Sequence, residues 1–197
     1  MSIRIAIAGV AGRMGQALVK SAGEDIAIAG GSERAGSPAL GASQGGWTVS
    51  DSAAKAAQSA DVWIDFTTPQ ASLEALDLLK LTSVKAAIIG TTGLSAAQEQ
   101  QVAEHAKRIA IVRDRNFSLG VNLMIGLVEQ VAARLGTDWD IEITEGHHRR
   151  KVDAPSGTAL MIGEAGAKGP GKSLSEMRVP PHDGMTGPRK EGSLAFS

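Results

Sequence analysis

Short apolar runs alternate with segments of helical periodicity through the first part of the chain. The runs predict strands at Ile3–Ala8, Ile26–Gly30, Trp47–Val49, Asp61–Phe66, Lys85–Ile89 and Ile109–Arg113. Ile3–Ala8 is largely apolar, as expected for a strand that helices cover on both faces. This alternation of strand and helix patterns predicts an α/β fold with a Rossmann-type, doubly wound parallel sheet.

Helix-start signals separate several of these strands. Helices are expected at Gly12–Ser21, from Pro69 to about Lys80, and from just after Ser95 to about Lys107. Thr68 is a favourable N-cap, and Pro69 suits the first helical position. Ser95 and Gln98 have the spacing of a capping box.

The alternation ends after Asn116. The remaining pattern predicts a helix over Val121–Leu135, a strand over Trp139–Glu145, a helix to about Lys168, a loop-like stretch from Gly169 and a last strand over Gly192–Ser197. No partner for that last strand is evident in the sequence, so we expect the chain to be a fragment. We expect a dinucleotide-binding domain over 1–116 and an incomplete α+β domain over 117–197.

Composition excludes several classes of protein. The 197 residues are 43% hydrophobic and carry a formal net charge of −1 with scattered Lys and Arg, so no nucleic-acid partner is expected. The absence of cysteine excludes thiolate chemistry and disulfides, and no metal site is expected. The apolar N-terminus is too short for a signal peptide, and no segment approaches the roughly 18 apolar residues of a membrane span. These features predict a soluble, cytoplasmic protein with no membrane partner.

A glycine-rich segment follows the first predicted strand directly. Gly9, Gly12 and Gly15 let the backbone approach a pyrophosphate, whose charge a helix start stabilises. Glu33 comes at the end of the second strand, about the 20 residues after the glycine-rich segment expected of a residue that binds the ribose of NAD. Arg34 beside it can pair with the 2′-phosphate of NADP. We expect a site for NADH or NADPH. The alternative is a tight turn beside a solvated loop.

Two later segments also follow predicted strands. Gly90–Gly93 and Asp114–Phe117 lie at the carboxyl edge of the sheet, where ligands bind in open α/β folds. Both can contact the cofactor, and both can equally be turns that lead into helix caps. The sequence leaves these two readings open.

The most informative segment is Glu145–Thr158. Two histidines and three cations, His147-His148-Arg149-Arg150-Lys151, precede a Ser-Gly-Thr turn that opens a helix. A helix start offers N–H groups and a positive dipole end to a carboxylate, and His and Lys add charge and a means of proton transfer. The segment predicts a site for an anionic, carboxylate-bearing small molecule.

Three other interpretations of this segment are possible. The basic run can be a solvated face. The adjacent histidines can be metal ligands, although neighbours on a strand point to opposite faces. Lys151 and Asp153 can form only a local ion pair.

At this segment the chain resembles the dihydrodipicolinate reductase family. The family is marked by a Glu-x-His-His-x-x-Lys-x-Asp-Ala-Pro-Ser-Gly-Thr-Ala string, which Glu145–Ala159 matches at every fixed position. Gly9–Gly15, Gly90–Gly93 and Asn116–Asn122 are similar to family motifs in the same order, so the resemblance covers essentially the whole chain. Asp114-Arg115 is a departure, because many members have small residues there.

The resemblance implies a reaction and roles for residues. Members reduce 4-hydroxy-tetrahydrodipicolinate to tetrahydrodipicolinate with NADH or NADPH, in the diaminopimelate route to lysine. By resemblance His147 is the acid/base residue, Lys151 is the proton donor, and His148, Gly157 and Thr158 bind the substrate carboxylates. The implied cofactor site is lined by Gly9, Val10, Ala11, Gly12, Arg13, Met14, Glu33, Arg34, Gly90, Thr91, Thr92, Asp114, Arg115, Asn116 and Phe117.

The resemblance also concerns assembly. Family members continue beyond the equivalent of Ser197, and that part completes a sheet that builds a homotetramer. The expectation is therefore an incomplete substrate-binding and tetramerisation domain over 117–197, whose activity and assembly are open.

Two other functions stay open. A non-catalytic module that binds the nicotinamide cofactor would share the first part of the chain. Another small-substrate dehydrogenase would share it too, although Asp153–Thr158 argues against this, because a different substrate would not need a carboxylate-shaped turn after two histidines.

Overall fold

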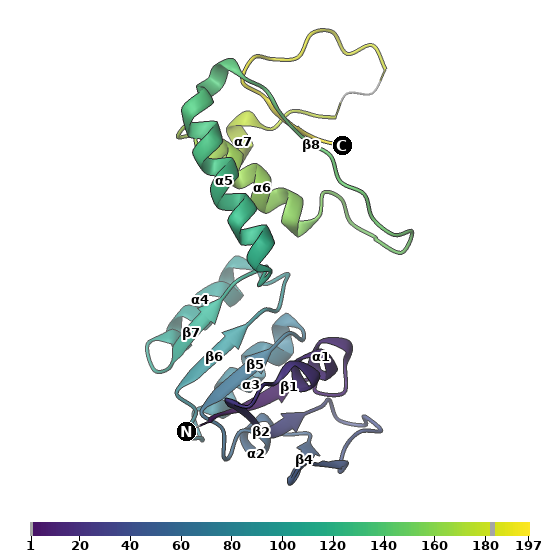
Figure 1. The fold of residues 1–197 in the computed structure, drawn as a ribbon, viewed down its shortest axis with the longest axis vertical. Helices are drawn as coiled ribbons and strands as arrows, with labels where there is room; N and C mark the ends of the chain where they lie inside the picture. Colours follow the sequence, from purple (N-terminus) through teal and green to yellow (C-terminus); the bar gives the residue numbers. More distant parts are fainter. Residues whose placement is uncertain (1, 182–183) are drawn as a thin grey trace. The chain divides into compact units, whose positions relative to one another are not determined.

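The computed structural model describes residues 2–181 and 184–197 (Figure 1). Its internal contacts divide the chain into two compact units, Met1–Arg115 and Asn116–Ser197. Asn116 therefore belongs with the second unit, although the sequence assigned it to the first. Each unit has its own core, and the two are described separately below.

The first unit is built on a seven-stranded sheet in the order β3-β4-β2-β1-β5-β6-β7. Its strands are β1 (Ile3–Ala8), β2 (Ile26–Ser32), β3 (Ser43–Gln44), β4 (Trp47–Ser50), β5 (Val62–Asp65), β6 (Ala86–Ile89) and β7 (Ala110–Arg113). Every neighbouring pair is parallel except β3 with β4. This confirms the predicted doubly wound sheet. The short strand β3 was not predicted, because its two residues lie in a Gly/Ser-rich stretch.

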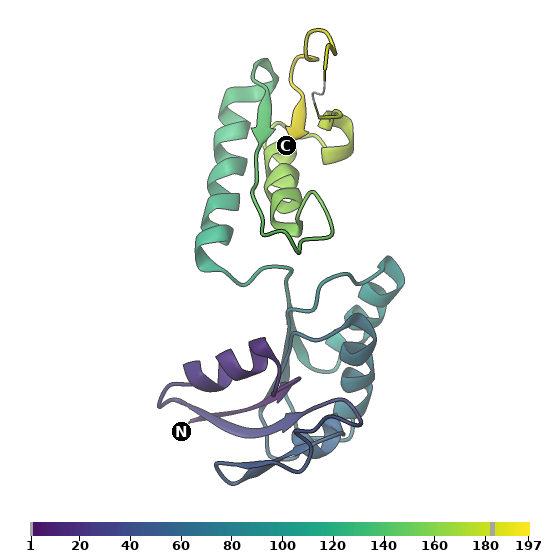
Figure 2. The ribbon, with the colours of Figure 1, turned by 90° about the vertical axis from the view of Figure 1, so that its right-hand side faces the viewer.

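Helices cover both faces of this sheet (Figure 2). They are α1 (Arg13–Ser21), α2 (Ala53–Ala56), α3 (Pro69–Leu79) and α4 (Ala96–Ala106). Ile5 and Ile7 of β1 pack in a cluster with residues of α1, whereas Trp63 of β5 packs in a second cluster with residues of α2 and α3. Alternate residues of a strand point to opposite faces, so the largely apolar strands supply both clusters.

The strand order reverses between β1 and β5. From β1 the chain runs outward through β2 to β4 and then crosses back to place β5 on the other side of β1. The loops that follow β1 and β5 therefore flank a topological switch point, the position where ligands bind in open α/β sheets.

The loop after β1 depends on close backbone packing. Gly9 has a φ of +60°, in the left-handed region that glycine tolerates. A Cβ on Gly15, in the first turn of α1, would lie 2.3 Å from the Gly9 carbonyl oxygen and 2.6 Å from Val10 Cα. Helix α1 can approach the loop after β1 this closely only because residue 15 has no side chain.

The second unit combines helices with a small sheet. Its elements are α5 (Leu119–Leu135), a 3-10 turn at Gly136–Asp138, β8 (Ile141–Ile143), α6 (Gly157–Lys168), α7 (Leu174–Met177) and β9 (Leu194–Phe196). Strands β8 and β9 pair in parallel, so the last strand has a partner that the sequence pattern did not reveal. Buried residues of β8, α6, α7 and β9 form one core that includes Ile143, Leu194 and Phe196.

Two sequence expectations for this unit are wrong in detail. The strand predicted over Trp139–Glu145 is limited to Ile141–Ile143, and Trp139 lies outside it with 59% of its surface exposed. Helix α7 lies in a stretch predicted to be loop, where Ser173 and Glu176 form a capping box that starts one helical turn.

Helix α5 presents an apolar face. Five of its exposed large side chains recur every four residues, at Leu119, Leu123, Leu127, Val131 and Leu135, and Met124 is exposed beside them. By length and composition alone, Leu119–Asp138 is apolar enough to cross a membrane, with a mean hydropathy of 1.2. The sequence expectation that no segment approaches this limit is therefore wrong at α5, although such a run is also common in helices of soluble proteins.

Replacing Gly15 tests the close packing of α1. We expect Gly15→Ala to lower the free energy of unfolding by about 1–3 kcal/mol, because the new methyl group meets backbone atoms that cannot rotate away. Gly23→Ala is the matched control in the same unit, since a Cβ there meets nothing within 4 Å. Urea unfolding followed by tryptophan fluorescence measures both variants. Equal midpoints for the two would contradict the packing argument.

Candidate active site

In the first unit, two cavities at the switch point are bordered by some of the predicted cofactor residues, namely Gly9, Gly12, Arg13, Met14, Glu33 and Arg34. One, of about 580 Å³, is lined by residues that include Gly9, Gly12, Met14, Glu33 and Thr67. The second, of about 490 Å³, is lined by residues that include Gly9, Glu33 and Arg34. The loops after β1, β2 and β5 thus meet around a hollow edge of the sheet.

Glu33 is tied to the glycine-rich loop. Its Oε1 accepts a hydrogen bond from the backbone N–H of Ala11 at 2.9 Å. The Gly12 N–H donates to the Gly9 carbonyl, which closes the turn that leads into α1. The carboxylate that was predicted to bind a ribose therefore lies beside the loop that was predicted to bind the pyrophosphate.

The residues Gly9–Met14 differ in what they can offer a ligand. The side chain of Val10 is 1% exposed and belongs to the core beneath the loop, so only its backbone is available. Arg13 and Met14 are exposed in the first turn of α1, and Arg34 is exposed after β2. Exposed cations beside free helix N–H groups suit a phosphate-bearing ligand.

The loop after β6 is buried more deeply than the sequence indicated. Thr91 is 1% exposed, and its hydroxyl group contacts Ser72 Oγ at 2.8 Å. A Cβ on Gly90 would lie 2.0 Å from the Phe66 ring, so that ring occupies the space beside the glycine. Thr92 is exposed. Of the two threonines, only Thr92 has an accessible side chain.

The predicted segment Asp114–Phe117 spans the division between the units. Asp114 continues from β7, where its N–H donates to the Ile89 carbonyl at 3.3 Å, and Arg115 ends the first unit. In the second unit, Asn116 Nδ2 donates to Thr158 Oγ1 at 3.2 Å, and Phe117 is 43% exposed. The structure thus joins Asn116, predicted for the cofactor, to Thr158, predicted for the substrate.

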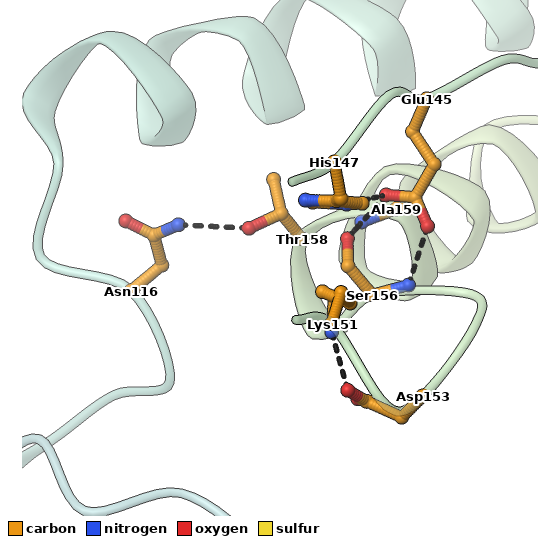
Figure 3. Close-up of polar contacts among 8 residues, drawn as sticks. All are labelled: Asn116, Glu145, His147, Lys151, Asp153, Ser156, Thr158 and Ala159. Atoms are coloured by element: carbon orange, nitrogen blue, oxygen red, sulfur yellow. Dashed lines mark hydrogen bonds and ion pairs between the residues drawn. The ribbon is translucent and has the colours of Figure 1, made fainter. Parts of the chain in front are cut away.

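Glu145 organises the second predicted site (Figure 3). One carboxylate oxygen accepts the Ser156 N–H at 2.6 Å, and the other accepts the Ser156 hydroxyl group and lies 3.0 Å from His147 Nε2. The pKa of Glu145 is lowered to about 2, first by the Ser156 hydroxyl group and then by the His147 ring and the Ser156 N–H. Glu145 is therefore ionised at neutral pH, and it holds His147 beside the turn that opens α6.

The other members of the basic run have local partners. His148 Nδ1 accepts the Arg150 N–H at 3.2 Å, which leaves Nε2 as the protonated nitrogen of the neutral ring. Lys151 Nζ lies 2.5 Å from Asp153 Oδ1, and this hydrogen bond lowers the pKa of Asp153. The local Lys151–Asp153 ion pair considered from the sequence is present.

The start of α6 supplies N–H groups. Ser156 is the N-cap, and its hydroxyl oxygen accepts the Ala159 N–H at 3.1 Å. The first intrahelical bond runs from the Leu160 N–H to the Ser156 carbonyl, so the helical ladder does not use the N–H groups of Gly157 and Thr158. A Cβ on Gly157 would meet nothing within 4 Å, and the approach to these groups is open.

A cavity of about 640 Å³ is lined by residues between Glu145 and Pro155 and by residues that the sequence did not single out. Its lining includes His147, His148 and Lys151, together with Arg178 and Phe196. The Arg178 guanidinium lies 5.1 Å from the centre of the Phe196 ring. Arg178 lies in the stretch predicted to be loop and Phe196 lies in the last strand, so no local pattern indicates either residue. Within residues 2–181 and 184–197, no group of three or more His, Asp or Glu side chains has metal-binding geometry.

Comparison with known proteins gives one family for both parts of the chain. The family model described as "Dihydrodipicolinate reductase, N-terminus" matches residues 3–117, and the one described as "Dihydrodipicolinate reductase, C-terminus" matches residues 120–197. The 4-hydroxy-tetrahydrodipicolinate reductases of Cereibacter sphaeroides and Caulobacter vibrioides are both 45% identical to the chain. The alignments cover 98% and 99% of this chain and 75% and 74% of those proteins.

A solved structure is similar throughout the chain. The dipicolinate-bound dihydrodipicolinate reductase from Paenisporosarcina sp. TG-14 has a TM-score of 0.74 and 27% sequence identity. The similarity covers 100% of this chain and 78% of that one.

The Glu145–Ser156 contact predicts a measurable titration. We expect Ser156→Ala to raise the pKa of Glu145 from about 2 toward its ordinary value of 4.5, because the largest cause of the depression is the lost hydroxyl group. Since the folded-state pKa is depressed, Glu145 stabilises the fold fully above pH 4.5 and loses this effect as pH falls from 4.5 to about 2. Carboxyl-carbon NMR titration measures the pKa. Ser156→Thr is the control that retains the hydroxyl group, and an unchanged pKa in Ser156→Ala would contradict the assignment.

Proposed function

The chain belongs to the dihydrodipicolinate reductase family, and we propose that it reduces 4-hydroxy-tetrahydrodipicolinate to tetrahydrodipicolinate with a nicotinamide dinucleotide. The observation that carries the proposal is the Glu145–Ser156 anchor. It holds His147 beside the turn that opens α6, and His147, Lys151 and Arg178 line one cavity. A small dicarboxylate needs such a combination of cations and open helix N–H groups.

Residues of the first unit fit the cofactor. The absence of side chains at Gly9 and Gly12 lets a pyrophosphate reach the start of α1, and Glu33 lies beside that loop to accept ribose hydroxyl groups. When bound, the reduced nicotinamide supplies the hydride. The remaining proposed contacts are Val10, Ala11, Arg13, Met14, Arg34, Gly90, Thr91, Thr92, Asp114, Arg115, Asn116 and Phe117. For Val10 and Thr91 we propose backbone contacts, because their side chains are buried.

Residues of the second unit supply charge and a proton. The product lacks the hydroxyl group of the substrate, so a proton must accompany the hydride while that group leaves as water. We assign the proton donor to Lys151 Nζ and the acid/base role to His147, which Glu145 orients. We assign the carboxylates to His148 Nε2 and to the N–H groups of Gly157 and Thr158, with Arg178 as an additional cation at the cavity wall.

Finer aspects of the function rest on the family resemblance. We propose that the reaction belongs to the diaminopimelate route to lysine, that the protein acts in the cytoplasm, and that it forms a homotetramer. We also propose that 1–116 bind the cofactor and that 117–197 bind the substrate and take part in assembly. Both NADH and NADPH are proposed as cofactors, because Glu33 suits ribose hydroxyl groups and Arg34 suits a 2′-phosphate.

Turnover of the purified chain tests the proposal. We expect oxidation of NADPH when the substrate is generated in place from aspartate semialdehyde and pyruvate. Lys151→Ala and His147→Gln should each lower kcat by at least about a hundredfold, the range of general acid–base catalysis, with NADH affinity nearly unchanged. Lys172→Ala is the control, because it removes an exposed lysine of the same unit that does not line the cavity.

The outcomes separate the proposed enzyme from a binding module. A chain that binds NADH without turnover is a non-catalytic cofactor-binding module, and the proposal is then wrong. A loss of cofactor binding in Lys151→Ala that matches its loss of activity would contradict the role assigned to that side chain.

Arg34 provides a test of cofactor selectivity. We expect Arg34→Ala to raise the Kd for NADPH about fivefold, the effect of losing one solvent-exposed ion pair. The Kd for NADH should change less than about twofold, because NADH lacks the 2′-phosphate. Fluorescence titration with each cofactor measures both constants, and equal weakening of the two would remove Arg34 from the 2′-phosphate site.

A further inference from the structure

A buried carboxylate lies behind the proposed cofactor site. Asp65, the last residue of β5, is 0% exposed, and no cationic side chain pairs with it in the part of the chain that the structure describes. It is instead surrounded by neutral donors. Thr67 donates to Oδ1 through its N–H at 2.9 Å and its hydroxyl group at 2.6 Å, Thr91 Oγ1 donates at 3.3 Å, and Trp63 Nε1 donates to Oδ2 at 3.4 Å.

These contacts join two loops at the carboxyl edge of the sheet. Thr67 follows β5 and Thr91 follows β6, and the Thr67 N–H also donates to Thr91 Oγ1 at 3.1 Å. The Thr91 hydroxyl group reaches the first turn of α3 through Ser72 Oγ at 2.8 Å. Asp65 is thus the common acceptor of a network that fixes both loops.

Thr67 transmits this constraint to the glycine-rich loop. Both of its polar groups point back to Asp65, and its methyl carbon Cγ2 lies 3.1 Å from the position that a Cβ on Gly9 would occupy. Gly9 and Thr67 lie at the switch point between β1 and β5, and both line the two cavities there. The Thr67 methyl group therefore limits the space beside Gly9, and the hydrogen bonds to Asp65 hold Thr67 in that position.

A purely structural role does not require a carboxylate at this position. Burial of a polar group is costly unless it is hydrogen-bonded, and a well-packed apolar side chain would serve the core at least as well. Three of the four donors to Asp65 come from the edge loops, not from the core. We infer that Asp65 is a positioning residue for nicotinamide-dinucleotide binding, acting through Thr67 on the pyrophosphate loop. The inference rests on the proposed function.

Cofactor binding by the full chain, with and without this network, tests the inference. The variants are Asp65→Asn, Thr67→Val and the double variant, with Asp61→Asn as matched control. Asp61 directly precedes β5 and pairs with Arg4 at 2.9 Å, so the control makes the same substitution at the opposite end of this strand. NADH affinity is measured by fluorescence titration, and binding of pyridine-2,6-dicarboxylate, measured by calorimetry, reports on the second unit.

The expected pattern is specific. Asp65→Asn and Thr67→Val each raise the Kd for NADH about tenfold, and the double variant is no more than about twofold weaker than either, because both break one chain of contacts. Asp61→Asn changes the Kd less than about twofold, and dicarboxylate binding stays within about twofold throughout. If Asp65→Asn does not fold, Thr67→Val, which keeps the side-chain shape, carries the test.

Other outcomes overturn the inference. The inference is wrong if Asp65→Asn or Thr67→Val binds NADH with wild-type affinity. It is also wrong if the two effects are independent and multiply to about a hundredfold in the double variant. A parallel loss of dicarboxylate binding would contradict it as well. If the proposed function itself is wrong, the wild-type chain binds no NADH. That result differs from those above, and it would contradict both proposals together.

Discussion

The chemistry of both units depends on one arrangement: a carboxylate that accepts a backbone N–H from the turn before a helix. Glu33 accepts from Ala11 ahead of α1, and Glu145 accepts from Ser156 ahead of α6. In each case the carboxylate fixes the turn, and the N–H groups of the first helical residues remain directed outward. A helix start with a disordered entry would bind an anion weakly, because the turn would have to be ordered on binding.

The two arrangements differ in their chemistry. Glu33 lies beside a loop of residues with little or no side chain, which favours a ligand that binds mainly through the backbone. Glu145 also holds an imidazole ring, and the cavity beside it contains a lysine and an arginine. The first unit is therefore suited to hold a long anionic cofactor, whereas the second is suited to neutralise a small anion and to transfer protons to it.

Much of the fold follows from local sequence. Strand β1 and the starts of α3 and α4 could be predicted because hydrophobic periodicity and caps such as Thr68 and Ser95 are local signals. Strand β3 and helices α2 and α7 are too short to show a period. The exposure of Trp139 and the pairing of β9 with β8 depend on which distant residues share the core, and no window of sequence contains that information.

The candidate site likewise has parts that could be predicted from the sequence and parts that could not. Its motifs could be recognised because Gly9–Gly15 and Glu145–Ala159 are continuous strings with chemical meaning. The contact of Arg178 with Phe196 and the bond between Asn116 and Thr158 join residues that lie far apart in the chain or outside any motif. The sequence predicts only that Asp65 belongs to a strand, and the threonine donors around it are seen in the structure alone.

The hydroxyl group of Ser156 is both a donor and an acceptor, since it donates to Glu145 and accepts from the Ala159 N–H. Most helix caps only accept, and so Ser, Thr, Asp and Asn are nearly interchangeable at them. Here an aspartate would bring a second negative charge against Glu145, and an alanine would remove both bonds. Of the usual set of caps, this one position thus tolerates only residues whose side chain can both donate and accept a hydrogen bond, which excludes aspartate.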